Sequence, residues 1–354
     1  DDMLATPTAT IDGQAATVAV NGAHPNYNAT YTTVGTTTEG AIAFTLDFTD
    51  EVGNAATQVT AVTDASSVTI DRTITTATSV SIVSDNANTA KAKTGDEITI
   101  SFTVDDNVLA TPTATIQTKT ATVAVDGAHP NYTAKYTLVG SDTEGAVAFS
   151  IDFSDESGNA ATTVTAVTDA TAVDFDRTAP TATTVSIVSD NADTTKAKAG
   201  DEITVSFTVD DDMLAAPTAT IQSKAATVAV AGAHPNYTAK YTLLAGDTDG
   251  AIGFTLDFSD EAGNPATSVT AVTDGTSVTY DKTAPTLAPV TIASNNGNTI
   301  YAKVGNTVTV SFTASETLIA DPTVTINGNA ATINNVAAPA YLASYDLVGG
   351  DTEG

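Results

Sequence analysis

The chain repeats itself with a period of 105 residues. The pentapeptide Ala-His-Pro-Asn-Tyr recurs around His24, His129 and His234, and successive histidines lie 129 − 24 = 105 and 234 − 129 = 105 residues apart. A unit of this length is close to the commonest domain size and is long enough to bury a hydrophobic core of its own. We therefore expect the 354 residues to form an array of similar domains instead of one large domain.

A second recurring pattern marks the ends of the repeats. An Asp-Glu-x-Gly-Asn turn is followed by a stretch rich in Thr and Val, which ends at Asp71, Asp176 or Asp281 with a basic residue directly after it. Boundaries at these aspartates give two whole repeats, residues 72–176 and 177–281. They also give two partial repeats, residues 1–71, which lack the first two strands, and residues 282–354, which lack the last strands.

The hydrophobic residues within a repeat alternate with a period of two, which is typical of strands that have one buried face. In the third repeat, Ile203, Val205, Phe207 and Val209 alternate with Thr and Ser, and no helical period competes. Seven strands are expected there, at residues 185–188, 202–210, 217–221, 226–230, 237–243, 252–258 and, interrupted at Asp274-Gly275, 267–280. The pattern predicts an all-β fold, a tandem array of Ig-like antiparallel β-sandwich domains. A propeller blade or a solenoid coil is shorter than one such repeat.

The composition narrows the possible partners. Twelve basic residues against 42 acidic ones give a net charge of −30, which argues against binding of nucleic acid or of an anionic membrane. Cations are the partners that such a chain attracts. Cysteine and tryptophan are absent, so the fold has neither disulfides nor the Cys and Trp core of an antibody domain. No apolar run reaches the length of a membrane-spanning helix.

Nothing in the repeat has the pattern of a catalytic site. Each whole repeat has a single His, and no Cys, second His or activated Ser stands at a fixed spacing from it. The His-Pro-Asn segment is better explained as a turn, because Pro fixes its own backbone angle and Asn tolerates turn conformations. We therefore expect the chain not to be an enzyme.

Three segments give the chain a resemblance to a known family. The Asp-x-x-Gly-Asn turn, the closing Asp-Lys-Thr-Ala-Pro at 281–285 and the stretch from Lys303 to Glu316 are similar to bacterial Ig-like tandem repeats of large surface adhesins. The resemblance extends over all 354 residues. It implies an extracellular protein at a cell surface, in which the repeats form a stalk that holds a distal binding module away from the cell. The first seam departs from the pattern, with Thr73-Ile74-Thr75 where the others have Thr-Ala-Pro.

Acidic residues are expected to gather where one repeat meets the next. If the strands run up and down a sandwich, the loops at 210–212 and 260–264 lie at the end where the linker enters. Crowded carboxylates repel one another unless a cation lies between them, and Ca²⁺ takes about six to eight oxygen ligands. We predict Ca²⁺ at the joints, held in the third repeat by Asp176, Asp210, Asp212, Asp260 and Glu261, in the second by Asp71, Asp105, Asp155 and Glu156, and in the fourth by Asp281.

The alternative is that these residues are ordinary turn formers, because Asp, Asn and Gly all favour turns. Neither an Asp-x-Asp-x-Asp-Gly loop nor a glycine-rich nonapeptide repeat is present to single out calcium. The fourth repeat has Ala314-Ser315-Glu316 in place of the Asp triplet, so calcium is expected to bind more weakly there.

Two classes of function fit this sequence. The first is a non-catalytic stalk, whose partners are the neighbouring repeats of the same chain and which is stiffened by calcium at the joints. The second is a subunit of a self-assembling extracellular filament or surface layer, whose partners are other copies of the chain. A weaker third reading takes the outward rows of Thr, such as Thr204 and Thr208, as a carbohydrate- or ice-binding face, although Thr is favourable on any exposed strand. The ligand of a distal module is not encoded in the repeats.

Overall fold

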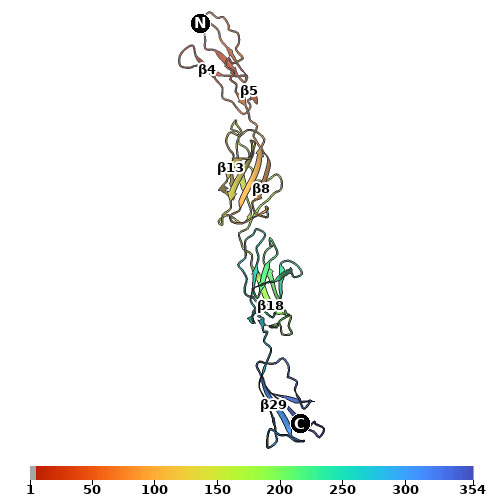
Figure 1. The fold of residues 1–354 in the computed structure, drawn as a ribbon. Helices are drawn as coiled ribbons and strands as arrows, with labels where there is room; N and C mark the ends of the chain where they lie inside the picture. Colours follow the sequence, from red (N-terminus) through yellow and green to blue (C-terminus); the bar gives the residue numbers. More distant parts are fainter. Residues whose placement is uncertain (1–4, 354) are drawn as a thin grey trace.

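In the computed structural model, the chain is an extended row of β-units with its termini at opposite ends (Figure 1). The structure describes residues 5–353, with the backbone alone at 335 and 336. Residues 1–4 and 354, which belong to the first and last predicted repeats, lie outside the described residues. Every regular element in the described part is a β-strand, which confirms the all-β prediction. No helix in this part is long and apolar enough to cross a membrane.

The third unit (residues 177–281) is built on a four-stranded antiparallel sheet. Its order is β18-β20-β24-β23, with the strands at Ala182–Ser189, Glu202–Val209, Asn236–Thr242 and Thr227–Val230. In the middle of the sheet, Phe207 pairs with Val185 on one side and with Tyr237 on the other. Side chains alternate across each strand, so one face of the sheet is apolar and the other carries Thr and Ser.

Two smaller sheets supply the other side of the core. One has the order β22-β21-β26, at Lys224–Ala225, Thr218–Ile221 and Phe254–Asp257, and the other has the order β19-β27-β25, at Lys196–Ala197, Thr279–Tyr280 and Gly250–Ala251. Their apolar side chains join those of the main sheet in one buried cluster, which includes Ile203, Ile221, Leu256 and Tyr280. The predicted inward positions of 202–210 are therefore confirmed, and the unit is sandwich-like, with one core between two layers.

The second unit (residues 72–176) repeats this arrangement around a core of its own. Its main sheet has the order β13-β14-β10-β8, at Thr122–Val125, Asn131–Thr137, Glu97–Val104 and Ala77–Ser84. Its smaller sheets are β12-β11-β16, at Lys119–Thr120, Thr113–Ile116 and Phe149–Asp152, and β15-β17-β9, at Gly145–Ala146, Asp174–Phe175 and Lys91–Ala92. The two buried clusters share no residue, so each unit buries its own core.

The strand predicted at 267–280, with an interruption at Asp274-Gly275, is confirmed only in part, since Thr279–Tyr280 is the one strand that forms there. Gly275 has a left-handed φ of 76°, which turns the chain in the middle of the segment. Upstream of this turn, the hydroxyl of Thr273 accepts a hydrogen bond from the Val185 backbone N–H at 2.8 Å, so a side chain covers the edge of β18. The antiparallel prediction also needs correction, because β19 and β27 pair in parallel, as do β9 and β17.

The first and fourth units contain part of the same pattern. The first has β1 to β7 at Thr8–Ile11, Gln14–Ala15, Thr17–Val20, Tyr27–Thr30, Gly40–Ala41, Phe44–Asp47 and Thr69–Ile70. Its described residues leave an apolar groove of about 520 Å³, lined by Ala9, Phe44 and Leu46 among others. The fourth has β28 to β33 at Leu287–Ser294, Thr307–Ala314, Thr325–Ile326, Asn329–Ala330, Thr332–Ala337 and Ala340–Asp346.

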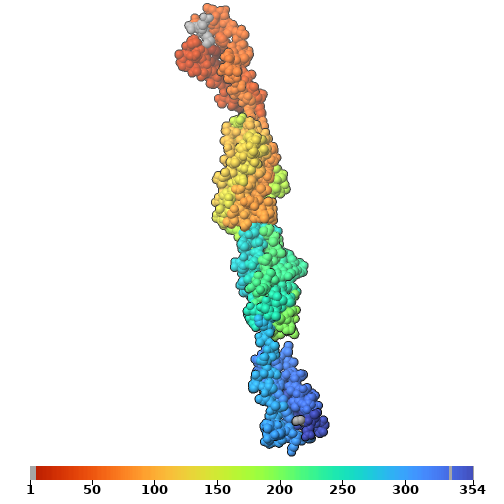
Figure 2. Space-filling model, viewed as in Figure 1, coloured from red at the N-terminus to blue at the C-terminus, as the bar shows by residue number. Residues whose placement is uncertain are grey.

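The contacts between neighbouring units differ along the row. The space-filling view shows the second and third units abutting over a broad end face, whereas narrower necks connect the other pairs (Figure 2). The joint between the second and third units is also where the predicted acidic loops meet the linker, so it positions the candidate site.

Candidate functional site

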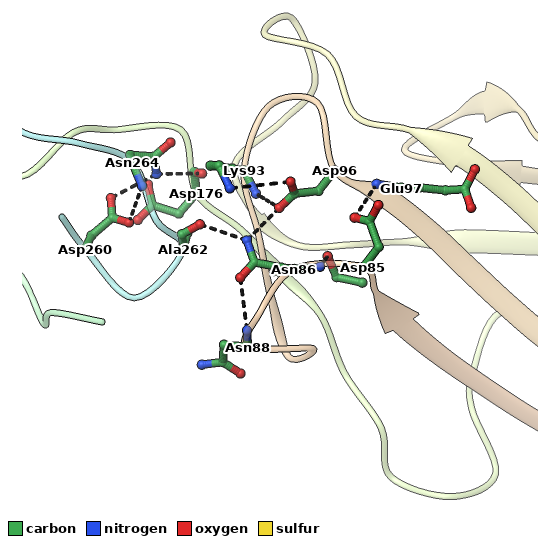
Figure 3. Close-up of polar contacts among 11 residues, drawn as sticks. Asp85, Asn86, Asn88, Lys93, Asp96, Glu97, Asp176, Asp260, Ala262 and Asn264 are labelled. Carbon is green, nitrogen blue, oxygen red and sulfur yellow. Dashed lines mark hydrogen bonds and ion pairs between the residues drawn. The ribbon is translucent and has the colours of Figure 1, made fainter. Parts of the chain in front are cut away.

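Three carboxylates come together at the joint between the second and third units. Asp176 ends the second unit, Asp211 follows β20, and Asp260 opens the Asp-Glu-Ala-Gly-Asn turn of the third unit. One carboxylate oxygen of each lies within 4.8 Å of the others. We call these three residues the joint cluster; Asp176 and Asp260 lie side by side in Figure 3.

The turn at 260–264 fixes the position of Asp260. Its carboxylate accepts hydrogen bonds from the backbone N–H of Asn264 at 2.8 Å and from the Asn264 side-chain amide at 2.9 Å. The same amide donates to the backbone oxygen of Asp176 at 3.1 Å, which ties the turn to the linker. Asp260 is only 1% exposed, so this carboxylate is held deep in the joint.

Electrostatic repulsion within the joint cluster is not relieved by a basic side chain. Burial raises the pKa of Asp176 above its usual value, and the charges of Asp260, Asp211 and Glu144 raise it further, against a lowering by the hydrogen bond from the Thr178 N–H. None of the ion pairs in the described part of the chain involves Asp176, Asp211 or Asp260. A proton or a bound cation would therefore stabilise the joint cluster.

The donor set of the joint cluster fits a hard divalent cation. Three carboxylates can supply up to about six oxygens, and Ca²⁺ takes about six to eight, the remainder being available from water. The cluster contains no nitrogen or sulfur ligand that would favour zinc or copper. Asp176, Asp211 and Asp260 are the residues that would hold such an ion.

Three of the residues predicted for this site are engaged elsewhere. The carboxylate of Asp210 accepts hydrogen bonds from the backbone N–H and the hydroxyl of Thr181, at 2.7 and 2.6 Å. Asp212 lies 3.5 Å from His234 Nδ1, and its side chain is 74% exposed. Glu261 faces Lys91 of the second unit, with 3.6 Å between carboxylate oxygen and Nζ. Of the predicted set, the structure brings together Asp176 and Asp260 alone.

The residues predicted for the other joints form no comparable cluster among the described residues. Asp105 accepts hydrogen bonds from Thr75 and Thr76, Asp155 accepts two from Asn159, and Asp71 accepts one from the Thr73 N–H. Glu156 is exposed in the same turn, and Asp281 accepts a hydrogen bond from the Thr283 N–H. In the fourth unit, the hydroxyl of Ser315 takes the place of the Asp210 carboxylate and accepts from the Thr286 N–H.

Asp211 was missed because its neighbours have the same residue type. The backbone N–H of Asp210 still donates to the Thr181 oxygen, so this residue extends the pairing of β20 with β18 and turns its side chain to the linker. Asp211 is the next residue along, and it reaches the cluster. No signal in the sequence distinguishes the three consecutive aspartates. Which of them reaches the cluster depends on where the backbone hydrogen bonds between β18 and β20 end.

Polar contacts close the joint beside the cluster (Figure 3). The side-chain amide of Asn86, in the second unit, donates to the backbone oxygen of Ala262 at 2.8 Å and to the Asp96 carboxylate at 2.7 Å. Asn86 and Ala262 are 8% and 1% exposed. Lys91 faces Glu261, and Lys93 lies beside Gly263. The 260–264 turn thus contacts the second unit and lines the cluster at the same time.

Comparisons with known proteins leave the function open. No protein-family model matches the chain, and no curated protein matches its sequence. One solved structure that aligns with it is SGBP-B of the Bacteroides ovatus mixed-linkage glucan utilization locus, in complex with a mixed-linkage heptasaccharide. The alignment covers 99% of this chain and 86% of that one, at 13% identity and a TM-score of 0.18. A TM-score this low supports no inference about fold, ligand or function.

Proposed function

We propose that the chain is a non-catalytic segment of a bacterial cell-surface stalk, made of Ig-like β-sandwich units of about 105 residues, which extends a distal binding module into the extracellular space. The observation that supports this proposal best is the closed joint between the second and third units. Asn86 and Ala262 are buried against each other across it. A joint with buried contacts holds its neighbours in line, and a stalk needs this property whereas a loose string of domains does not.

The surface charge also favours a solvated stalk over a self-assembled filament. A net charge of −30 makes copies of the chain repel one another over distances of about a Debye length. The His side chains support a structural role, since His129 and His234 each pack edge-on against a Tyr in the same turn, with ring centroids 6.0 and 5.9 Å apart.

In this proposal, Ca²⁺ bound by Asp176, Asp211 and Asp260 stiffens the joint. The ion would offset the repulsion of the joint cluster and connect the linker with two loops of the third unit. Because binding to the folded joint stabilises it by mass action, calcium at about 100 times its Kd would add about 2.7 kcal/mol. The ligand set predicted from the sequence is revised accordingly, with Asp211 in place of Asp210, Asp212 and Glu261.

Small-angle X-ray scattering of the full chain tests the stalk. If each unit adds roughly 30 to 40 Å along the axis, the four-unit row has a maximum dimension of roughly 120 to 160 Å and the scattering of a rod. A maximum dimension and scattering profile typical of a compact or randomly bent chain, in calcium as well as in chelator, would overturn the proposal. A mass that rises with concentration would favour the filament instead.

A further inference from the structure

We call the end of a unit that faces its successor the tail face. In the second unit it contains Asn86, Lys91 and Lys93, which contact the 260–264 turn of the third unit. An ion pair contributes to this contact, because Lys91 Nζ lies 3.6 Å from the Glu261 carboxylate and the Lys91 side chain is only 32% exposed. The residue at the Lys91 position therefore meets the Glu of the incoming turn.

The tail face of the fourth unit has a different chemistry at the same positions. Two periods of 105 residues place Ile300 at the position of Ala90, Tyr301 at that of Lys91 and Val304 at that of Thr94. These three side chains are 79%, 65% and 64% exposed. The turn itself is kept, since the Tyr301 N–H donates to the Asn298 oxygen as the Lys91 N–H donates to the Asn88 oxygen.

Exposure at these positions is a property of the tail face and not of the fourth unit alone. In the third unit, which has the full set of sheets, the equivalent residues Thr195, Lys196 and Ala199 are exposed as well. Side chains at these positions are thus exposed even in a whole unit, and in the second unit Lys91 also lies 3.7 Å from Asp174 of its own unit. The change from small or basic side chains to Ile, Tyr and Val therefore alters what the tail face offers to a partner, with little effect on the core.

The acidic residues of the tail face are lost together with the basic one. Asn295 and Asn306 replace the carboxylates of Asp85 and Asp96, and Thr307 replaces Glu97. Of the charged residues around this face in the second unit, only Lys93 keeps a basic counterpart, Lys303. The tail face of the fourth unit therefore carries fewer charged groups and three exposed side chains, Ile300, Tyr301 and Val304, that are larger and more apolar than their counterparts in the second unit.

An acidic turn such as 260–264 fits this apolar face poorly. Its Glu would lose water against Ile and Val without gaining the lysine that Lys91 provides, and a desolvated charge without a partner is unfavourable. We propose that the tail face of the fourth unit docks a β-unit whose turn carries an uncharged apolar side chain at the position of Glu261. The array thus contains two kinds of joint, one based on charge pairs and one apolar, and the residue at the Lys91 position specifies which unit stacks stiffly on it.

A transplant of the tail face into the full chain tests this specificity. Ala90→Ile, Lys91→Tyr and Thr94→Val give the second unit the tail face of the fourth, opposite a turn that retains Glu261. Spin labels at Thr122→Cys and Thr227→Cys, both exposed and in equivalent strands, report the joint through their distance distribution, and the chain has no other cysteine. In calcium, we expect the transplant to broaden the distribution at least twofold, and Glu261→Val added to it to restore the original width.

The matched control carries the same chemistry at a tail face that does not touch the 260–264 turn. Thr195→Ile, Lys196→Tyr and Ala199→Val in the third unit should leave the distance distribution of these labels unchanged. Broadening in this control would overturn the proposal, because the substitutions would then act by disturbing a unit itself. A transplant that leaves the width unchanged, or one that Glu261→Val fails to rescue, would overturn it too.

Discussion

Single aspartates at the joints have opposite electrostatic environments. Hydrogen bonds from the hydroxyl and N–H of Thr76, and from the Thr75 hydroxyl, lower the pKa of Asp105 from 3.8 to about 2. Asp105 therefore stabilises the fold above its ordinary pKa, and this contribution, on the order of 1 kcal/mol for so exposed a group, is lost as the pH falls from 3.8 to about 2. The pKa of Asp176 is raised instead. Aspartate therefore stabilises the linker through hydrogen bonds at position 105, whereas at position 176 its charge is unfavourable.

The raised pKa of Asp176 predicts that acid tightens the joint when calcium is absent. A folded-state pKa above the unfolded value means that the stability from this group is present below 3.8 and is lost as the pH rises through the raised pKa. In chelator, we expect the distance distribution between labels at 122 and 227 to narrow as the pH falls from neutral towards this range. Asp176→Asn should remove the dependence, and a distribution that broadens with acid in the unmodified joint would contradict the assignment.

Neighbouring aspartates provide a matched pair of variants for the joint cluster. Asp211→Asn removes one carboxylate from the cluster, whereas Asp212→Asn removes one that faces His234. We expect Asp211→Asn to weaken calcium binding at least tenfold by isothermal titration calorimetry, with Asp212→Asn within a factor of two of the unmodified chain. Equal losses in the two variants would show that calcium responds only to the overall charge.

At the scale of elements, the repeated units show which features local sequence can predict. The strand at 202–209 was predictable because Ile, Val and Phe alternate with Thr and Ser, and a one-residue shift would expose the whole apolar set. The segment at 267–280 has a similar composition and forms little strand, because a turn at Gly275 and hydroxyl contacts to β18 replace the backbone ladder. The meeting of Asp176 with the 260–264 turn was predictable from topology, but the choice of Asp211 was not.

Removal of one of these hydroxyls should destabilise the third unit. Thr273→Val keeps the shape of the side chain but leaves the Val185 N–H without its acceptor at 2.8 Å. We expect a loss of about 1 to 3 kcal/mol in the free energy of unfolding, measured by urea denaturation. Thr270→Val, at an exposed position of the same segment, is the control and should change stability by less than about 0.5 kcal/mol. A Thr273→Val loss no larger than that of the control would show that the hydroxyl does not support the edge of β18.

At the scale of the whole molecule, the joint between the second and third units combines a polar latch with a charge cluster. The latch is the Asn86 amide, which contacts Ala262 and Asp96 at once, and it requires no cation. Asn191 has the equivalent position in the third unit, and its amide donates to Asp201 within that unit. Among the described residues, a turn meets a tail face at the joint between the second and third units alone, so the latch acts at that joint.

The latch predicts a change in shape that calcium does not reverse. Asn86→Ala removes the buried contact and should bend the row on average, which lowers the maximum dimension in small-angle scattering in calcium and in chelator. Asn191→Ala is the matched control and should leave the joint between the second and third units as it was. A full-length rod in Asn86→Ala would indicate that other contacts are sufficient to close the joint.

The most direct test of a cation-stiffened stalk is the distance distribution across this joint, measured by pulsed electron double resonance on the full chain labelled at 122 and 227. With calcium, we predict a single narrow distribution of distances, and with chelator at neutral pH a broader distribution. In the Asp211→Asn variant, we expect calcium to have no effect on the width. The same distribution with calcium and with chelator would contradict the calcium part of the proposal and leave the latch and the linker to hold the units in line.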